Sequence, residues 1–188
     1  MRAMHGLWLA AKASMMKVVE RCVGCNAEVE VIEGPIHRYM TSAPACWKRY
    51  GELLAVLYSQ PANQKALIMC VDTYAVQHPG RPSPQAIQSV AIHLLNMYGY
   101  LVQGRSVKVP QATFTEKAFH AIAPPERRAA YWLEPQPRFE GAQTVFDIPI
   151  EGAEDAIATC NRAWAESVWS AWSTHHTKIA EWYGRFAR

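Results

Sequence analysis

The sequence has no run of apolar residues close to the roughly 20 that a membrane-spanning helix needs, and no clustered stretch of lysine and arginine. Its formal net charge is +3 at pH 7, and the basic residues are scattered along the chain. Nucleic-acid-binding domains usually present a basic stripe on one face. We therefore expect neither a membrane-bound protein nor a nucleic-acid partner.

Cysteine is also scarce, with five residues among 188. An odd, small number of cysteines in a chain of this length does not suit a disulfide framework, and it predicts a reducing, cytoplasmic location. Charged residues make up only 19% of the chain and hydrophobic residues 50%, which predicts folded structure over most of its length. Seven tryptophans and eight tyrosines indicate an aromatic-rich core or an aromatic-lined pocket.

The first residues of the chain do not read as a targeting signal. The apolar run at 7–11 is shorter than the roughly 7–15 residues of a signal-peptide core, and Met15 or Met16 would be a plausible start. We expect residues 1–14 to be a flexible extension, 15–47 a cysteine-bearing module, and 44–188 a helical domain that forms one compact unit with that module.

Residue patterns predict a mainly helical fold behind a small hairpin. Valine-rich, alternating segments at 17–21 and 28–33 flank the Cys-Val-Gly-Cys turn and predict two short strands. Apolar spacing, proline and capping residues predict the helices and one further short strand. The expected helices span 44–60, 63–78, 84–98, 113–119 and 154–186, and the strand spans 144–148. The expected fold is a four-helix-type bundle with an N-terminal zinc-knuckle or β-hairpin module.

The cysteines near the N-terminus suggest a metal site. Cys22 and Cys25 form a Cys-x-x-Cys turn that Gly24 makes easier, and Cys46 lies in the first turn of an expected helix, where the helix N-terminus favours a thiolate. His37, in the intervening loop, would complete four zinc ligands. Two alternatives stay open: a redox pair and three buried thiols without a role.

A second group of polar residues falls where helices would bury apolar ones. Asp72 and His78 lie on one expected helix, His93 on the next, and His175 and His176 on the last. A buried carboxylate needs a partner, and a histidine beside a carboxylate can act as an acid or base. Helix bundles build such sites, or a second metal site, from facing helices. Alternatively, these residues only fix the packing.

Several motifs together resemble an uncharacterised bacterial family, a domain of unknown function. They are CVGC, GPIHRYM, PACW, VDTYAVQHPG, QSVAIHLL and WAESVWSAWSTHH. The resemblance implies that one family pattern contains Cys22, Cys25, His37, Cys46, Asp72, His78, His93, His175 and His176. The Val-Gly filling of the Cys-x-x-Cys turn departs from that pattern, as does the N-terminal extension. No activity is carried over by it.

These observations leave three functional hypotheses. The first is a zinc protein with one structural ion and a pocket lined by the aspartate and histidines, doing acid-base or metal-assisted chemistry on a small molecule. The second is a non-enzymatic, zinc-stabilised interaction module. The third and weakest is a thiol redox or thiol-transfer protein that uses Cys22 and Cys25. A homo-oligomer is compatible with each of them.

Overall fold

The structure is a computed structural model, and it describes residues 18–60, 64–105 and 112–186. The expected extension at 1–14 lies outside these residues. Two strands come first, β1 (Val19–Arg21) and β2 (Glu28–Glu30). The α-helices follow: α1 (Pro44–Ser59), α2 (Gln64–Gln77), α3 (Pro84–Leu101), α4 (Ala112–Ile122), α5 (Pro125–Arg128), α6 (Glu154–Ala171) and α7 (His176–Phe186). The predicted fold class, mainly helical with a small N-terminal hairpin, is confirmed.

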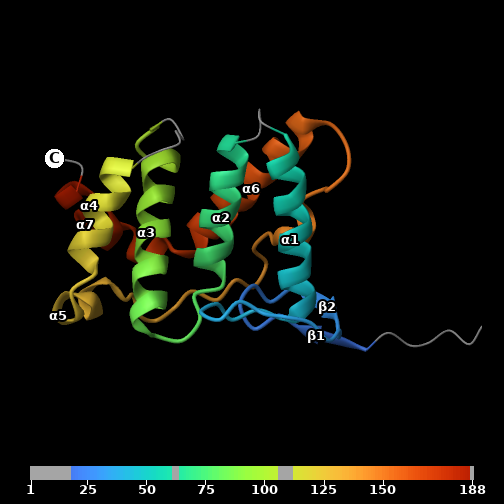
Figure 1. Ribbon diagram of the computed structural model, residues 1–188, viewed down its shortest axis with the longest axis horizontal. Helices are drawn as coiled ribbons and strands as arrows, with labels where there is room; N and C mark the ends of the chain where they lie inside the picture. The colour runs from blue at the N-terminus through green and yellow to red at the C-terminus, as the bar shows by residue number, and fades with distance from the viewer. Residues whose placement is uncertain (1–17, 61–63, 106–111, 187–188) are drawn as a thin grey trace, which may run out of the picture.

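The helices form two layers. Helices α1, α2, α3 and α4 stand side by side in chain order, and each packs against the next (Figure 1). Behind them α6 packs across α2, and α7 packs against α3 and α4. The core between the layers is rich in aromatic residues, as the composition predicts. Its largest fully buried side chains are Trp164, Trp172 and Trp182.

Local sequence signals set the starts of the front helices. Pro44 occupies the first turn of α1, where its missing N–H costs nothing. Ser83 caps α3, because its hydroxyl accepts a hydrogen bond of 3.1 Å from the backbone N–H of Ala86, and Pro84 follows at the first helical position. Both starts agree with the prediction from the sequence.

The two strands pair antiparallel, with Glu20 opposite Val29. The hairpin lies at the lower end of α1 (Figure 1), and β2 packs against that helix through the buried side chain of Val29. A two-stranded hairpin is marginal on its own in water. The stability of the hairpin therefore depends on its contacts with the helices.

Two sequence predictions about the second half of the chain are wrong. The expected strand at 144–148 is a 3₁₀ turn, Val145–Asp147, because Thr144 and Asp147 form a capping box. The expected single helix at 154–186 is two helices, α6 and α7, separated by the 3₁₀ turn Ser173–His175. The apolar spacing continues through this break because both helices bury tryptophans in the same core.

Candidate metal centre

Three cysteines and one histidine converge beneath the hairpin. The ligand atoms of Cys22, Cys25, Cys46 and His78 all lie within 4.8 Å of one another. None of the four side chains is more than 1% exposed, and the cysteines form no disulfide. In the part of the chain that the structure describes, this is the one group of cysteine, histidine and carboxylate side chains close enough to hold a metal ion.

The spacing of these atoms fits a tetrahedral zinc site. Zinc–sulfur bonds of about 2.3 Å and zinc–nitrogen bonds of about 2.0–2.1 Å place two sulfurs about 3.8 Å apart, and a sulfur and a nitrogen about 3.6 Å apart. The Sγ atoms of Cys25 and Cys46 are 3.7 Å apart. The Sγ of Cys46 is 3.4 Å from Nε2 of His78. The cluster therefore has the dimensions of a site with three sulfurs and one nitrogen.

The hairpin turn brings the first two thiols together. The backbone N–H of Asn26 donates to the carbonyl of Cys22 over 2.8 Å, and the N–H of Cys22 donates to the carbonyl of Ala27 over 2.8 Å. Asn26 adopts a φ of 62°, a left-handed conformation that asparagine tolerates better than most residues. This tight turn directs the side chains of Cys22 and Cys25 to the same side.

The N-terminus of α1 supplies the third thiol and part of the electrostatic environment. Cys46 lies in the first turn of α1, where unpaired backbone N–H groups favour negative charge. One of these groups, the N–H of Ala43, points at Cys22 Sγ over 3.4 Å. The hydroxyl of Tyr74 lies 3.7 Å from Cys46 Sγ. These donors help to carry the negative charge of three thiolates.

His78 follows the last residue of α2, and its ring is held in the orientation that a metal ligand needs. Its Nδ1 donates to the backbone carbonyl of Tyr74 over 2.9 Å. This bond fixes the proton on Nδ1 and leaves the Nε2 lone pair directed at the thiols, as is usual for metal-binding histidines. The ring also stacks on that of Tyr74, with centroids 4.0 Å apart.

Without a cation, the three thiols compete for protons. Hydrogen bonds from Cys25 and Cys46 lower the pKa of Cys22 well below its ordinary value. The hydrogen bond with Cys22 raises the pKa of Cys25 to about 12, and hydrogen bonds with Cys22 and Cys25 raise the pKa of Cys46 far above its ordinary value. A divalent cation would stabilise the thiolate form of all three.

The fourth position in this cluster belongs to His78, where the sequence predicted His37. His37 Nδ1 instead accepts a hydrogen bond of 3.2 Å from the N–H of Tyr39, and its ring packs near Trp47 with centroids 5.2 Å apart. The difference arises because α1 and α2 lie side by side and bring His78 onto Cys46, a contact between residues far apart in sequence. The feature of the sequence that could have indicated His78 as the fourth ligand is its position at the end of the apolar face of α2.

Asp72 and His93 form a hydrogen-bonded pair. The sequence predicted a partner for this buried carboxylate, and His93 was one of the candidates. His93 Nδ1 donates to Asp72 Oδ1 over 2.6 Å, and Asn96 Nδ2 donates to the same oxygen over 3.1 Å. The Asp72 side chain is 3% exposed and that of His93 is 20% exposed. Sequence reasoning missed Asn96, which lies one turn after His93 on α3.

His175 and His176 each donate to a backbone carbonyl. His175 Nε2 donates to Pro135 O and His176 Nε2 donates to Trp169 O, both over 2.9 Å. The His176 ring also stacks on Trp169, with centroids 4.1 Å apart. His176 thereby caps the end of α6, where the helix stops. These contacts belong to the junction of α6 and α7 and do not involve Asp72, His78 or His93.

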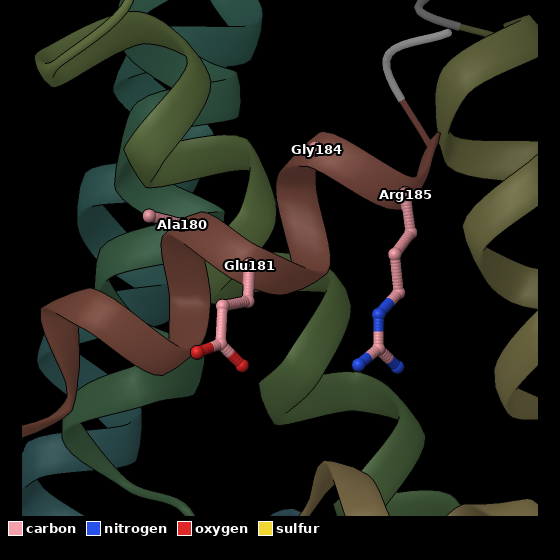
Figure 2. Close-up of a pocket in the computed structure, with 4 residues that line it drawn as sticks. All are labelled: Ala180, Glu181, Gly184 and Arg185. Atoms are coloured by element: carbon pink, nitrogen blue, oxygen red, sulfur yellow. The ribbon is translucent and has the colours of Figure 1, made fainter.

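Two hollows of the surface lie near some of these groups, and neither joins Asp72 to His93. A small cavity of about 30 Å³ lies between His37, His78 and the start of α3, with room for no more than a few water molecules. A wider, open depression lies on α7, where Glu181 and Arg185 project from the same side of the helix beside Ala180 and Gly184 (Figure 2). Neither hollow is lined by Asp72 or His93.

The fold and the buried cluster define a small, mainly helical protein with a three-cysteine, one-histidine site able to hold a metal ion. The chain matches the model of DUF5946, a family of unknown function, over residues 20–173, and it belongs to that family. The expected membership of an uncharacterised family is thus confirmed. No curated protein and no solved structure matches the chain. In the described residues no helix is long and apolar enough to cross a membrane.

Proposed function

We propose that Cys22, Cys25, Cys46 and His78 bind one zinc ion, and that this ion holds the hairpin on helices α1 and α2. The observation that carries the proposal is the convergence of the four buried ligand atoms within 4.8 Å. Three sulfurs and one imidazole nitrogen are a common ligand set of structural zinc sites. The ligands come from the hairpin, from the start of α1 and from the end of α2, so the ion would link all three.

The same geometry favours a structural ion over a catalytic one. Catalytic zinc keeps a coordination position for water or substrate, whereas structural zinc has four protein ligands. Here four protein ligands are available, and each is at most 1% exposed. The protein would therefore act as a zinc-stabilised helical interaction module, which was the non-enzymatic alternative from the sequence.

Burial also counts against the redox and thiol-transfer hypothesis. A reactive cysteine needs an accessible thiolate. Cys22 and Cys25 are each 1% exposed, so neither thiol is accessible. Reduced, metal-binding cysteines suit a reducing compartment, and this supports the proposed cytoplasmic location.

Metal analysis of matched variants tests the proposal. The wild-type protein, purified without chelators, should contain about one zinc per chain. Cys46→Ser and His78→Ala should lose most of the zinc, while His37→Ala and Cys160→Ser should retain it. If His37→Ala loses the ion and His78→Ala keeps it, the proposed ligand set is wrong. If the wild-type protein binds no zinc at micromolar concentrations, the whole proposal is wrong.

One observation favours a second candidate function, acid-base chemistry at His93. The 2.6 Å contact from Nδ1 to buried Asp72 orients the imidazole and leaves Nε2 as the nitrogen that could act as the base. Modification by diethyl pyrocarbonate, which attacks accessible neutral imidazole, tests this. If His93 is poised as a base, it should react faster than His120 of α4. If it reacts more slowly than exposed His120, a packing role is favoured.

A further inference from the structure

The hairpin carries an unusual share of the exposed apolar side chains. Among the nine large hydrophobic residues that are exposed in the described chain, five lie in the short stretch from 18 to 36. They are Val18, Val19, Val23, Val31 and Ile36. Scattered apolar residues on a surface are ordinary, but a concentration of them on one small element marks an interaction site.

Two of these valines extend the packed face of the hairpin. The N–H of Val31 donates to the carbonyl of Val18 over 2.9 Å, so the two residues are opposite each other. Side chains two residues apart on a strand share a face, so Val31 lies on the face of Val29. Val29 is buried against α1, whereas Val31 is 48% exposed and Val18 is 69% exposed. The apolar face thus continues past the part that α1 covers.

Acidic residues surround these valines. The stretch from 18 to 36 holds four glutamates and one arginine, although the whole chain has a net charge of +3. Glu20 and Glu33 are exposed, and Glu28 lies 4.0 Å from Arg21. A partner for this region needs apolar side chains for the valines and positive charge for the glutamates.

The backbone of β1 also has an edge that can pair. In an antiparallel pair, successive residues direct their N–H and C=O groups alternately toward the partner strand and away from it. Cys22 N–H and Val18 C=O bond toward the β2 side, so those of Val19 and Arg21 point away. In the described residues the sheet has two strands, and nothing else pairs with this edge.

We propose that this hairpin surface, defined as Val18, Glu20, Val31 and Glu33, which share one face of the hairpin, binds an extended segment of another protein that carries apolar and basic side chains on one face. The segment adds as a strand along β1, and the face that it turns to this surface carries apolar side chains for the valines and basic side chains for the glutamates, two residues apart. The inference rests on the proposed function, because zinc would hold the hairpin rigid and so lower the entropy cost of binding.

The probe, the alternating peptide, is a synthetic peptide of about twelve residues in which valine and lysine alternate on one face, at every second position, with serine between them, so that it spans the short strand. Its binding to the zinc-loaded full chain is measured by fluorescence anisotropy, and zinc content is measured on the same samples. A peptide with glutamate in place of lysine, and one with the same composition in two blocks, serve as controls. The wild-type protein should bind the alternating peptide, and bind it more weakly as salt concentration rises.

Two double variants of the hairpin surface should weaken binding about tenfold while retaining the zinc. They are V18S with V31S, and E20K with E33K. Matched controls far along the chain are V102S, at the exposed end of α3, and E116K on α4, and neither should change the affinity more than about twofold.

The outcomes separate this inference from the proposed function. If zinc is present and the alternating peptide does not bind, the docking inference alone is wrong. The same holds if the two control peptides bind as tightly as the alternating peptide. Wild-type affinity in both double variants also overturns it. If the wild-type protein contains no zinc but binds the peptide, and the hairpin variants weaken this binding, docking is supported and the zinc proposal is wrong.

Discussion

Gly24 lies directly against the imidazole ring of His78. A Cβ atom built on Gly24 would overlap the ring and the carbonyl oxygen of Thr41. Glycine is therefore the residue that lets the hairpin turn approach the end of α2 closely enough for its thiols to reach His78. This contact joins the two halves of the proposed metal site, one in the hairpin and one in the helices.

Gly24→Ala should weaken the metal site. The added methyl group has to push the turn away from His78, and such overpacking typically costs about 1–3 kcal/mol. We expect zinc affinity to fall about 10–100-fold, as when a neighbour that orients a ligand is lost, with a matching loss of thermal stability. Competition with a chromophoric chelator measures the affinity.

Gly51→Ala is the matched control for this substitution. Gly51 lies within α1, and a Cβ there has nothing within 4 Å. Alanine should stabilise the helix by about 0.5–1 kcal/mol without changing zinc affinity. Equal zinc affinity in both glycine variants would show that the approach of Gly24 to His78 does not matter for metal binding.

Removal of zinc should release the hairpin while most helical structure persists. The packing of α2 on α3 and α6 does not involve the cluster, but the hairpin buries little apolar surface of its own. Hydrogen exchange after chelation should therefore accelerate at 18–46 and change little in α6. Far-UV circular dichroism should keep most of its helical signal. Unchanged exchange at 18–46 would contradict a structural role for the ion.

The Asp72–His93 pair should show a large coupling energy. Breaking a buried hydrogen bond to a charged group leaves its partner unsatisfied, which costs about 1–3 kcal/mol. A double-mutant cycle with Asp72→Asn and His93→Gln, measured by urea unfolding, should give a coupling of about 1–3 kcal/mol. Additive effects of the two substitutions would show that the 2.6 Å contact contributes little to folding.

Gln77→Leu should destabilise the junction of the two layers. Gln77 is fully buried, accepts a 2.9 Å hydrogen bond from Trp164 Nε1, and donates over 2.7 Å to the carbonyl of Gln143. Leucine would leave both partners unsatisfied, at a cost of about 2–4 kcal/mol by thermal or urea unfolding.

Gln88→Leu is the control for that variant, because Gln88 on α3 makes one exposed hydrogen bond, to Phe119 O. Its effect should stay within about 0.5 kcal/mol. Similar losses of stability in the two glutamine variants would argue against a special role for the buried network of Gln77 and Trp164.

The parts of the fold that were predictable depend on local signals. The Cys-x-x-Cys turn, the prolines at 44 and 84 and the serine cap at 83 act over a few residues, and the hairpin, α1 and α3 begin where these signals indicate. The three thiols of the cluster were predictable for the same reason, since they lie close together in sequence. The break between α6 and α7 was not, because no glycine or proline marks it.

The fourth member of the cluster could not be found from local spacing. His78 is 32 residues beyond Cys46, and the packing of α1 on α2 brings the two together. His37 is closer in sequence, but the N–H of Tyr39 engages its Nδ1 in a local turn. The pairing of Asp72 with His93 likewise follows from the packing of α2 on α3, which periodicity alone does not fix.

X-ray absorption at the zinc edge of the purified protein decides whether the metal lies where we propose. The proposed site predicts about three sulfur neighbours near 2.3 Å and one nitrogen near 2.0–2.1 Å. The imidazole signal should persist in His37→Ala, which is expected to keep its zinc. A spectrum dominated by oxygen and nitrogen neighbours, or four sulfurs with no imidazole, would contradict the assignment of Cys22, Cys25, Cys46 and His78 as the ligands.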